Sequence, residues 1–78
     1  MDPVQYFVLL EGAGWQIWSE GHLYGPYLSR TEAVLAARTA AKETVTFGFP
    51  SQVLVRDYGK PDFRTQWTFA AEPQRVAV

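Results

Sequence analysis

An alanine-rich segment, SRTEAVLAARTAAKE at residues 29–43, limits the folds open to this chain. Ser29 followed three residues later by Glu32 predicts a helix start, because the hydroxyl can accept a backbone N–H while the carboxylate reaches back to the cap. At the helical repeat, one broad stripe then holds five alanines: Ala33, Ala36, Ala37, Ala40 and Ala41. Alanines let a helix lie close to a sheet, so larger side chains of the sheet must fill the layer between them.

Short segments rich in β-branched and aromatic residues precede and follow this helix. Three are predicted as strands before it and two after it: QYFVLLE, WQIWSE, LYGPY, QVLVR and RTQWTF. The proline at position 26 cannot donate to a strand ladder, so the third strand is expected at a sheet edge. The resulting β-β-β-α-β-β order predicts an α+β fold, an antiparallel sheet with one Ala-rich helix packed on one face.

Alternation along the strands predicts which side chains face the helix. Trp15 and Ile17 share one face of the second strand and are expected beneath the helix. Gln16 and Trp18 then face away, and on the first strand Phe7 or its neighbour Tyr6 must do likewise.

Two further expectations concern the second half of the chain. In the last strand, Thr65, Trp67 and Phe69 are predicted to share one face. The segment TVTFGFPS is interpreted as a connection, in which Phe47 or Phe49 tucks beneath the fold.

The length of 78 residues suits one small domain, predicted at 1–69, followed by a flexible tail at 70–78. Cysteine is absent, which fits a reducing compartment and rules out disulfides and thiolate metal sites. The first residues lack the basic start of a signal peptide, and no apolar run approaches the ~20 residues that span a bilayer. We therefore expect a cytoplasmic domain without membrane contact.

Charge is distributed unevenly along the chain. Residues 1–29 contain three acidic residues and no Lys or Arg, whereas all seven basic residues lie in 30–78. Nucleic acid is the alternative partner, because sheet aromatics can stack bases and a basic hairpin carrying Arg56, Lys60 and Arg64 could contact phosphates. The net charge of -1 makes that case weak.

No catalytic constellation is recognisable. His22 is the only histidine and stands at a turn, without cysteines or paired carboxylates at ligand spacing. The charged turn DYGKPD lacks the spacing of a calcium loop. We predict a non-enzymatic domain with no cofactor and no metal.

The surplus of aromatic residues is the strongest functional indication. One helix covers one face of the sheet, so aromatics on the other face must be covered by a loop, by a partner or by a second copy. We predict an interaction surface containing Phe7, Trp18, Tyr24 and Leu35, and a homodimer as the favoured assembly. Coverage by the 44–51 loop and the tail is the main alternative, followed by another protein or a ligand.

The chain resembles the small bacterial domain-of-unknown-function family 2188. The resemblance rests on the strand and glycine turn leading to Trp15, on the Ala-rich helix from Thr31 to Ala41, and on the charged turn from Asp57 to Lys60. It spans residues 5–69, although the added Pro61, Asp62 and Phe63 lengthen the last turn. The resemblance implies a fold and no activity.

Overall fold

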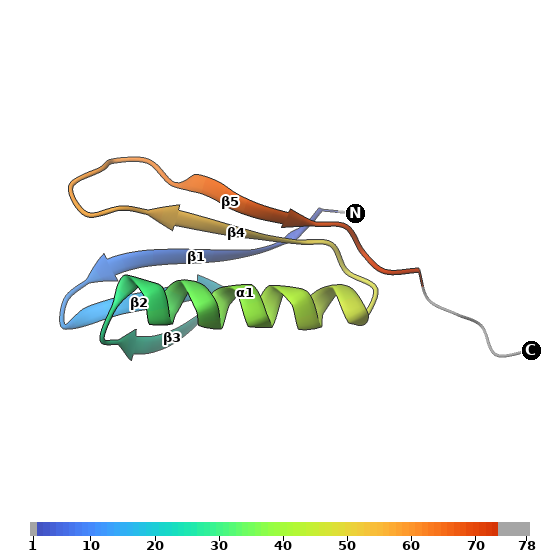
Figure 1. The fold of residues 1–78 in the computed structure, drawn as a ribbon, viewed down its shortest axis with the longest axis horizontal. Helices are drawn as coiled ribbons and strands as arrows, with labels where there is room; N and C mark the ends of the chain where they lie inside the picture. The colour runs from blue at the N-terminus through green and yellow to red at the C-terminus, as the bar shows by residue number, and fades with distance from the viewer. Residues whose placement is uncertain (1, 74–78) are drawn as a thin grey trace, which may run out of the picture.

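The computed structural model describes residues 2–73, which form one sheet covered on one side by one helix (Figure 1). In chain order the elements are β1 (Val4–Glu11), β2 (Gly14–Ser19), β3 (His22–Tyr27), α1 (Arg30–Thr46), β4 (Ser51–Arg56) and β5 (Arg64–Phe69). The predicted α+β fold of three strands, one helix and two strands is confirmed.

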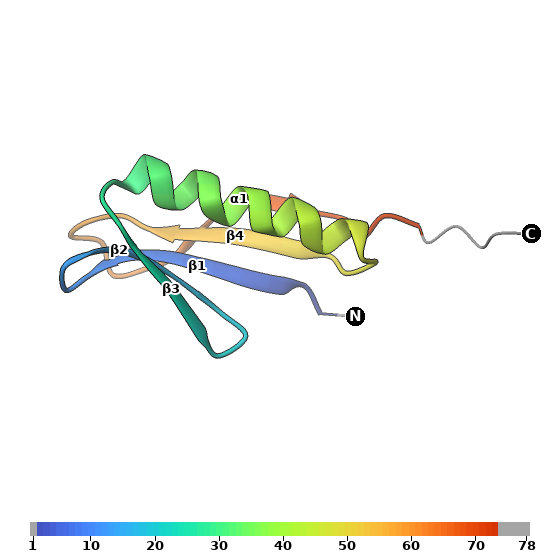
Figure 2. The ribbon, with the colours of Figure 1, turned by 90° about the horizontal axis from the view of Figure 1, so that it is seen from below.

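The five strands are arranged in the order β3-β2-β1-β4-β5. Three neighbouring pairs are antiparallel, as expected, but β1 and β4 at the centre run parallel. The chain reverses direction four times, on entering β2, β3, α1 and β4, so β4 runs in the same direction as β1. Figure 2 shows α1 along one face, while β2 and β3 turn away from it.

The predicted helix cap is confirmed, with one difference. The hydroxyl of Ser29 accepts the Glu32 N–H at 3.1 Å. The Glu32 carboxylate accepts the N–H of Leu28, at 3.2 Å, and so reaches one residue further back than in a standard capping box. This contact ties the end of β3 to the first turn of α1.

The predicted connection after residue 43 was partly wrong. Thr44–Thr46 continue the helix, and Phe47 caps it with its N–H donating to the Thr44 carbonyl. Phe47 is 74% exposed and Phe49 is also exposed, so neither ring is tucked beneath the fold. The N–H of Gly48 donates to the Val45 carbonyl, and this tight helix end directs both rings outward.

The core lies between α1 and the two central strands. The alanines at positions 33, 37 and 41 are fully buried against Val8, Val53 and Val55. Ser51 is also fully buried, and its hydroxyl donates to the Ala41 carbonyl at 2.7 Å. Small helix residues thus meet β-branched sheet residues, as the alanine stripe predicted.

A bulge in β5 overturns one predicted face. Val53 pairs with Trp67, but the next residue of β4, Leu54, pairs with Thr65, so Gln66 is an extra residue. Trp67 and Phe69 therefore pack toward the core, while Thr65 lies with Leu54 on the opposite face. Simple alternation fails here because one strand has a residue more than its partner.

The described part of the segment after β5, residues 70–73, is hydrogen-bonded to the end of α1. The N–H of Glu72 donates to the Val45 carbonyl at the end of α1. The remainder of the predicted tail, residues 74–78, lies outside the described residues. Within residues 2–73, no helix is long and apolar enough to cross a membrane.

Candidate functional site

An apolar row crosses the sheet on the face opposite α1, which we call the open face. The strand registers align Leu23 with Trp18, Trp18 with Phe7, and Phe7 with Leu54. Trp18 is 39% exposed and Leu23 is 50% exposed, although both are large apolar side chains. The row is therefore most exposed on the side of β2 and β3.

Part of the open face is covered by the loop between β4 and β5. The ring of Phe63 packs edge-on against Phe7, with centroids 5.1 Å apart, and the Arg56 guanidinium lies 5.3 Å from the Phe63 centroid. Figure 2 shows this loop dipping to the side of the sheet away from α1. The 44–51 loop and the tail had been considered as covers, but the residue that packs on Phe7 comes from this other loop.

The four predicted surface residues do not form one surface. Phe7 and Trp18 are cross-strand partners on the open face. Tyr24 pairs with Ile17 and therefore points to the helix side of the sheet. Leu35 is 54% exposed on α1, away from the core alanines.

An irregularity in β3 brings two tyrosines to the same face. Trp15 pairs with Tyr27 and Ile17 pairs with Tyr24, so two steps along β2 correspond to three along β3. Residues three apart in a regular strand would face opposite ways. The extra residue lies at Gly25–Pro26, where Gly25 has a φ of 116°.

A close approach of the two strands fixes this arrangement. A Cβ at Gly14 would lie 2.8 Å from the carbonyl oxygen of Tyr27, so the position requires glycine. Because residue 14 is glycine, β3 can lie close against β2, and Tyr27 lies on the side of the sheet that α1 covers.

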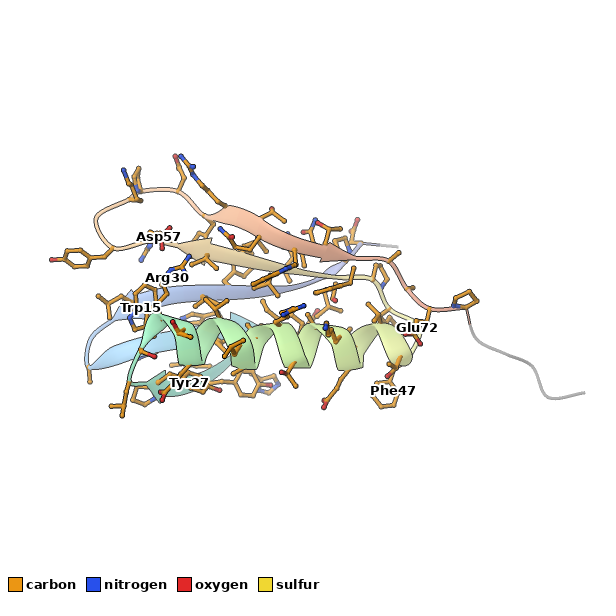
Figure 3. The ribbon with its side chains drawn as sticks, in the orientation of Figure 1. Trp15, Tyr27, Arg30, Phe47, Asp57 and Glu72 are labelled. Atoms are coloured by element: carbon orange, nitrogen blue, oxygen red, sulfur yellow. The ribbon has the colours of Figure 1, made fainter. Side chains whose placement is uncertain are left out.

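Both tyrosines line a cavity between β3 and α1, which we call the tyrosine pocket. Its volume is about 200 Å³. It is lined by Tyr6, Ile17, Tyr24, Tyr27, Ala36 and Ala40. The two alanines leave this space open because they are too short to fill the layer over β2 and β3. Figure 3 shows Tyr27 on the β3 side of the helix, with Arg30 and Asp57 on the other side.

The proposed phosphate contacts are divided between the two faces. Arg56 pairs with Leu9 on the open face, whereas Arg64 pairs with Val55, whose side chain faces α1. Lys60 lies in the loop and lines a small surface hollow together with Arg64, Asp57 and Asp62, so two carboxylates lie among these cations. The three cations therefore do not form one basic strip.

His22 lies at the start of β3, exposed, with its ring 6.3 Å from that of Tyr24. Among residues 2–73 no group of three or more His, Cys, Asp or Glu side chains could hold a metal ion. The one ion pair of this part of the chain joins Arg30 to Asp57 at 2.6 Å. None of these groups is near an obvious reaction site.

The sequence predictions missed Leu23, Leu54, Phe63 and Tyr27. Leu54 could have been found, since it alternates with two valines that read as core residues. The glycine and proline inside LYGPY could have indicated a bulge, which would have placed both tyrosines on one face. The position of Phe63 depends on how a seven-residue turn folds back, and no local signal predicts that.

Comparisons with known proteins add no relative. No family model, no curated protein and no solved structure matches this chain. The resemblance to family 2188 stays a prediction. The functional proposals below therefore rest on the geometry of the molecule.

Proposed function

We propose that this chain is a non-enzymatic protein-association module that forms a homodimer through its open face. The observation that carries the proposal is the apolar row from Leu23 to Leu54, with Trp18 39% exposed at its centre. Burying an aromatic ring of this size is among the largest single contributions that a protein interface can make.

The surroundings of the row support an interface. Its uncharged neighbours on the open face are the buried Leu9 and the polar residues Gln5, Gln16, Gln52, Thr65 and Thr68. Glu11 and Arg56, the charged residues that the registers place on this face, are the last residues of their strands. Interface centres are typically depleted in charge and enriched in aromatic residues and arginine.

A second copy of this chain is the occupant that fits the row best. A two-fold axis that lies between two stacked open faces, parallel to both sheets, would cross the two rows near Phe7 and Trp18 and would apply the same apolar strip twice. Each copy would then cover the half of the row that the Phe63 loop leaves exposed in the other.

The test is the solution mass, measured by light scattering on a sizing column over a range of concentrations. We expect twice 8.8 kDa for the natural chain and 8.8 kDa for Trp18→Ser. Leu35→Ser is the matched control, because it removes an exposed apolar side chain from the helix and should leave the dimer intact. A natural chain that is monomeric at every concentration would overturn the proposal, and a dimeric Trp18→Ser variant would exclude this face.

A further inference from the structure

The tyrosine pocket lies on the helix side of the sheet and is independent of the open face. Three aromatic rings, from Tyr6, Tyr24 and Tyr27, contribute to one cavity of about 200 Å³. A tetrahedral alkylated ammonium group has a van der Waals volume of roughly half that, and several aromatic faces around one space are the usual way of binding it. The size and the walls therefore suit this class of ligand.

The tyrosine faces are not already occupied by a cation of the chain. In the described part of the molecule, arginines lie over two rings: Arg38 is 5.2 Å from the Trp67 centroid, and Arg56 is 5.3 Å from that of Phe63. Neither ring lines the pocket, and no charged residue is among the lining residues. A ligand cation would thus meet no competing or repelling charge on the walls.

The acidic and the basic residues of α1 lie on different sides of the helix, and the acidic ones are nearer the pocket. Glu32 lies four residues before Ala36, and Glu43 lies three residues after Ala40, so both acids are on the pocket side of α1. The Glu32 carboxylate is held at the end of β3 by the Leu28 N–H. The rim on the helix side is therefore acidic.

The helix arginines point the other way. Arg30 pairs with Asp57 at 2.6 Å, beside the β4–β5 loop, and Arg38 packs on Trp67 of β5 (Figure 3). The strands that supply the tyrosines belong to residues 1–29, which contain three acids and no Lys or Arg. No Lys or Arg of these strands therefore opposes a cation at the pocket, and the nearby acids of α1 favour one.

Hydrogen bonding orients Tyr6. The Thr44 hydroxyl donates its one hydrogen to the Ala40 carbonyl at 2.9 Å. The contact of 2.6 Å between the Tyr6 and Thr44 oxygens must therefore use the Tyr6 hydroxyl as donor. A phenol that donates its proton has an electron-richer ring, which strengthens its attraction for a cation.

From these observations we infer that the tyrosine pocket binds an alkylated ammonium group. The shared chemistry is a tetrahedral N-methylated cation, which could belong to a free small molecule such as choline or to a trimethylated lysine side chain. The aromatic walls hold the methyl groups, and the acidic rim compensates the charge at longer range. The inference does not rest on the proposed dimer, since its residues lie on the other face of the sheet.

The experiment is an NMR titration of the full chain that follows the ring signals of Tyr24 and Tyr27. Choline is compared with 3,3-dimethylbutanol, which has the same shape and no charge. We expect choline to bind at least about tenfold more tightly than the neutral alcohol. Equal affinities would overturn the inference, because the pocket would then recognise only apolar shape, and the absence of any shift with choline would overturn it as well.

Four variants locate the site. Ala36→Leu fills the cavity and should abolish the choline shifts, whereas Leu35→Ala, one position away on the outer side of α1, should leave them unchanged. Tyr24→Leu should weaken binding about tenfold, and Tyr24→Phe, which keeps the ring, should retain most of it. Tyr24 is 48% exposed, so both changes leave the core intact. Binding that is unaffected by Ala36→Leu would place the ligand elsewhere and contradict the assignment.

The source of the cation is distinguished by the ligand. Free choline and a short peptide carrying trimethyllysine are titrated in parallel, each with its unmethylated counterpart as the control. Tighter binding of the peptide would assign the pocket to a protein side chain, and tighter binding of choline would assign it to a small molecule.

Discussion

The helix covers the two halves of the sheet very differently. Over β1 and β4, fully buried alanines meet fully buried valines, and Ser51 donates to the Ala41 carbonyl within the layer. Over β2 and β3, the same helix leaves a cavity of about 200 Å³, and every residue of β3 except Tyr27 is exposed. One half is a close-packed core, and the other is a half-covered aromatic surface.

This difference follows from a single property of the helix. Alanine brings the helix axis close to strands that carry valine, where the short side chains on both sides fill the layer. Where the strands turn away, as β2 and β3 do, alanine is too short to follow them. The same residue type therefore stabilises one half of the domain and leaves the other half free to bind.

The largest difference in stability between the halves should appear when one large apolar side chain in each half is shortened to alanine. Val53→Ala removes two methyl groups from a site with no exposed surface and should cost about 2–3 kcal/mol of unfolding free energy. Leu23→Ala on β3, which removes more atoms from a half-exposed site, should cost less than about 0.5 kcal/mol. Urea denaturation of both variants gives the comparison, at a concentration where the natural chain and both variants have the same mass. Equal losses would show that the β2–β3 half is as tightly packed as the centre.

Enlarging neighbouring alanines tests the same contrast from the other direction. Ala37→Leu overfills a site with no exposed surface and should destabilise the fold by about 1–3 kcal/mol. Ala36→Leu places the same atoms into the tyrosine pocket and should change stability by less than about 0.5 kcal/mol. If Ala36→Leu is the more damaging of the two, the pocket is not the open space described above.

The junction between the halves is the helix cap that follows β3. Ser29→Ala removes the acceptor of the Glu32 N–H and should cost about 1 kcal/mol. Ser29→Asp supplies another acceptor at the same position and should retain most of the stability. Thermal melts of the natural chain and the two variants give the comparison. An unchanged melting temperature for Ser29→Ala would contradict a stabilising contribution of the cap.

The smallest effect on stability is expected for the ion pair at the surface of the packed half. Arg30→Gln removes the ion pair with Asp57, whose two side chains are 42% and 47% exposed, and should cost about 0.5 kcal/mol or less. That loss should shrink further in about 1 M salt, where surface charges are screened. A larger, salt-independent loss would mean that Arg30 stabilises the fold through packing of its aliphatic stem.

The regular parts of the fold were also the parts that the sequence predicted well. The alanine stripe, the Ser29 cap and the alternation of Ile17 with Trp18 depend on local patterns that repeat at a fixed period. Those patterns predicted the helix, the buried alanines of its inner face, the five strands and the exposure of Trp18, but they missed the buried Val34 and Val45. The parallel pairing of β1 and β4 required counting the reversals of the chain rather than reading a pattern.

The features that the sequence predicted poorly belong to the irregular parts. An extra residue in β3 moved Tyr24 to the helix side, and an extra residue in β5 moved Thr65 to the open face. A bulge reverses every face assignment beyond it, and its position depends on the partner strand. Packing of Phe63 on Phe7 joins residues far apart in the chain, so neither segment alone indicates it.

The parallel pairing of the two central strands has a consequence for how the chain is made. Gln5 and Gln52, whose side chains are hydrogen-bonded, lie 47 positions apart in the chain. While the protein is being synthesised, the edge of β1 that β4 will occupy stays unpaired until β4 has left the ribosome. Contacts of such long range also slow folding, because a large loop must close before they form. The nascent hairpin of β1 and β2 therefore exposes a pairing edge and its apolar residues until β4 emerges, and in this interval the chain is open to aggregation or to capture by a chaperone.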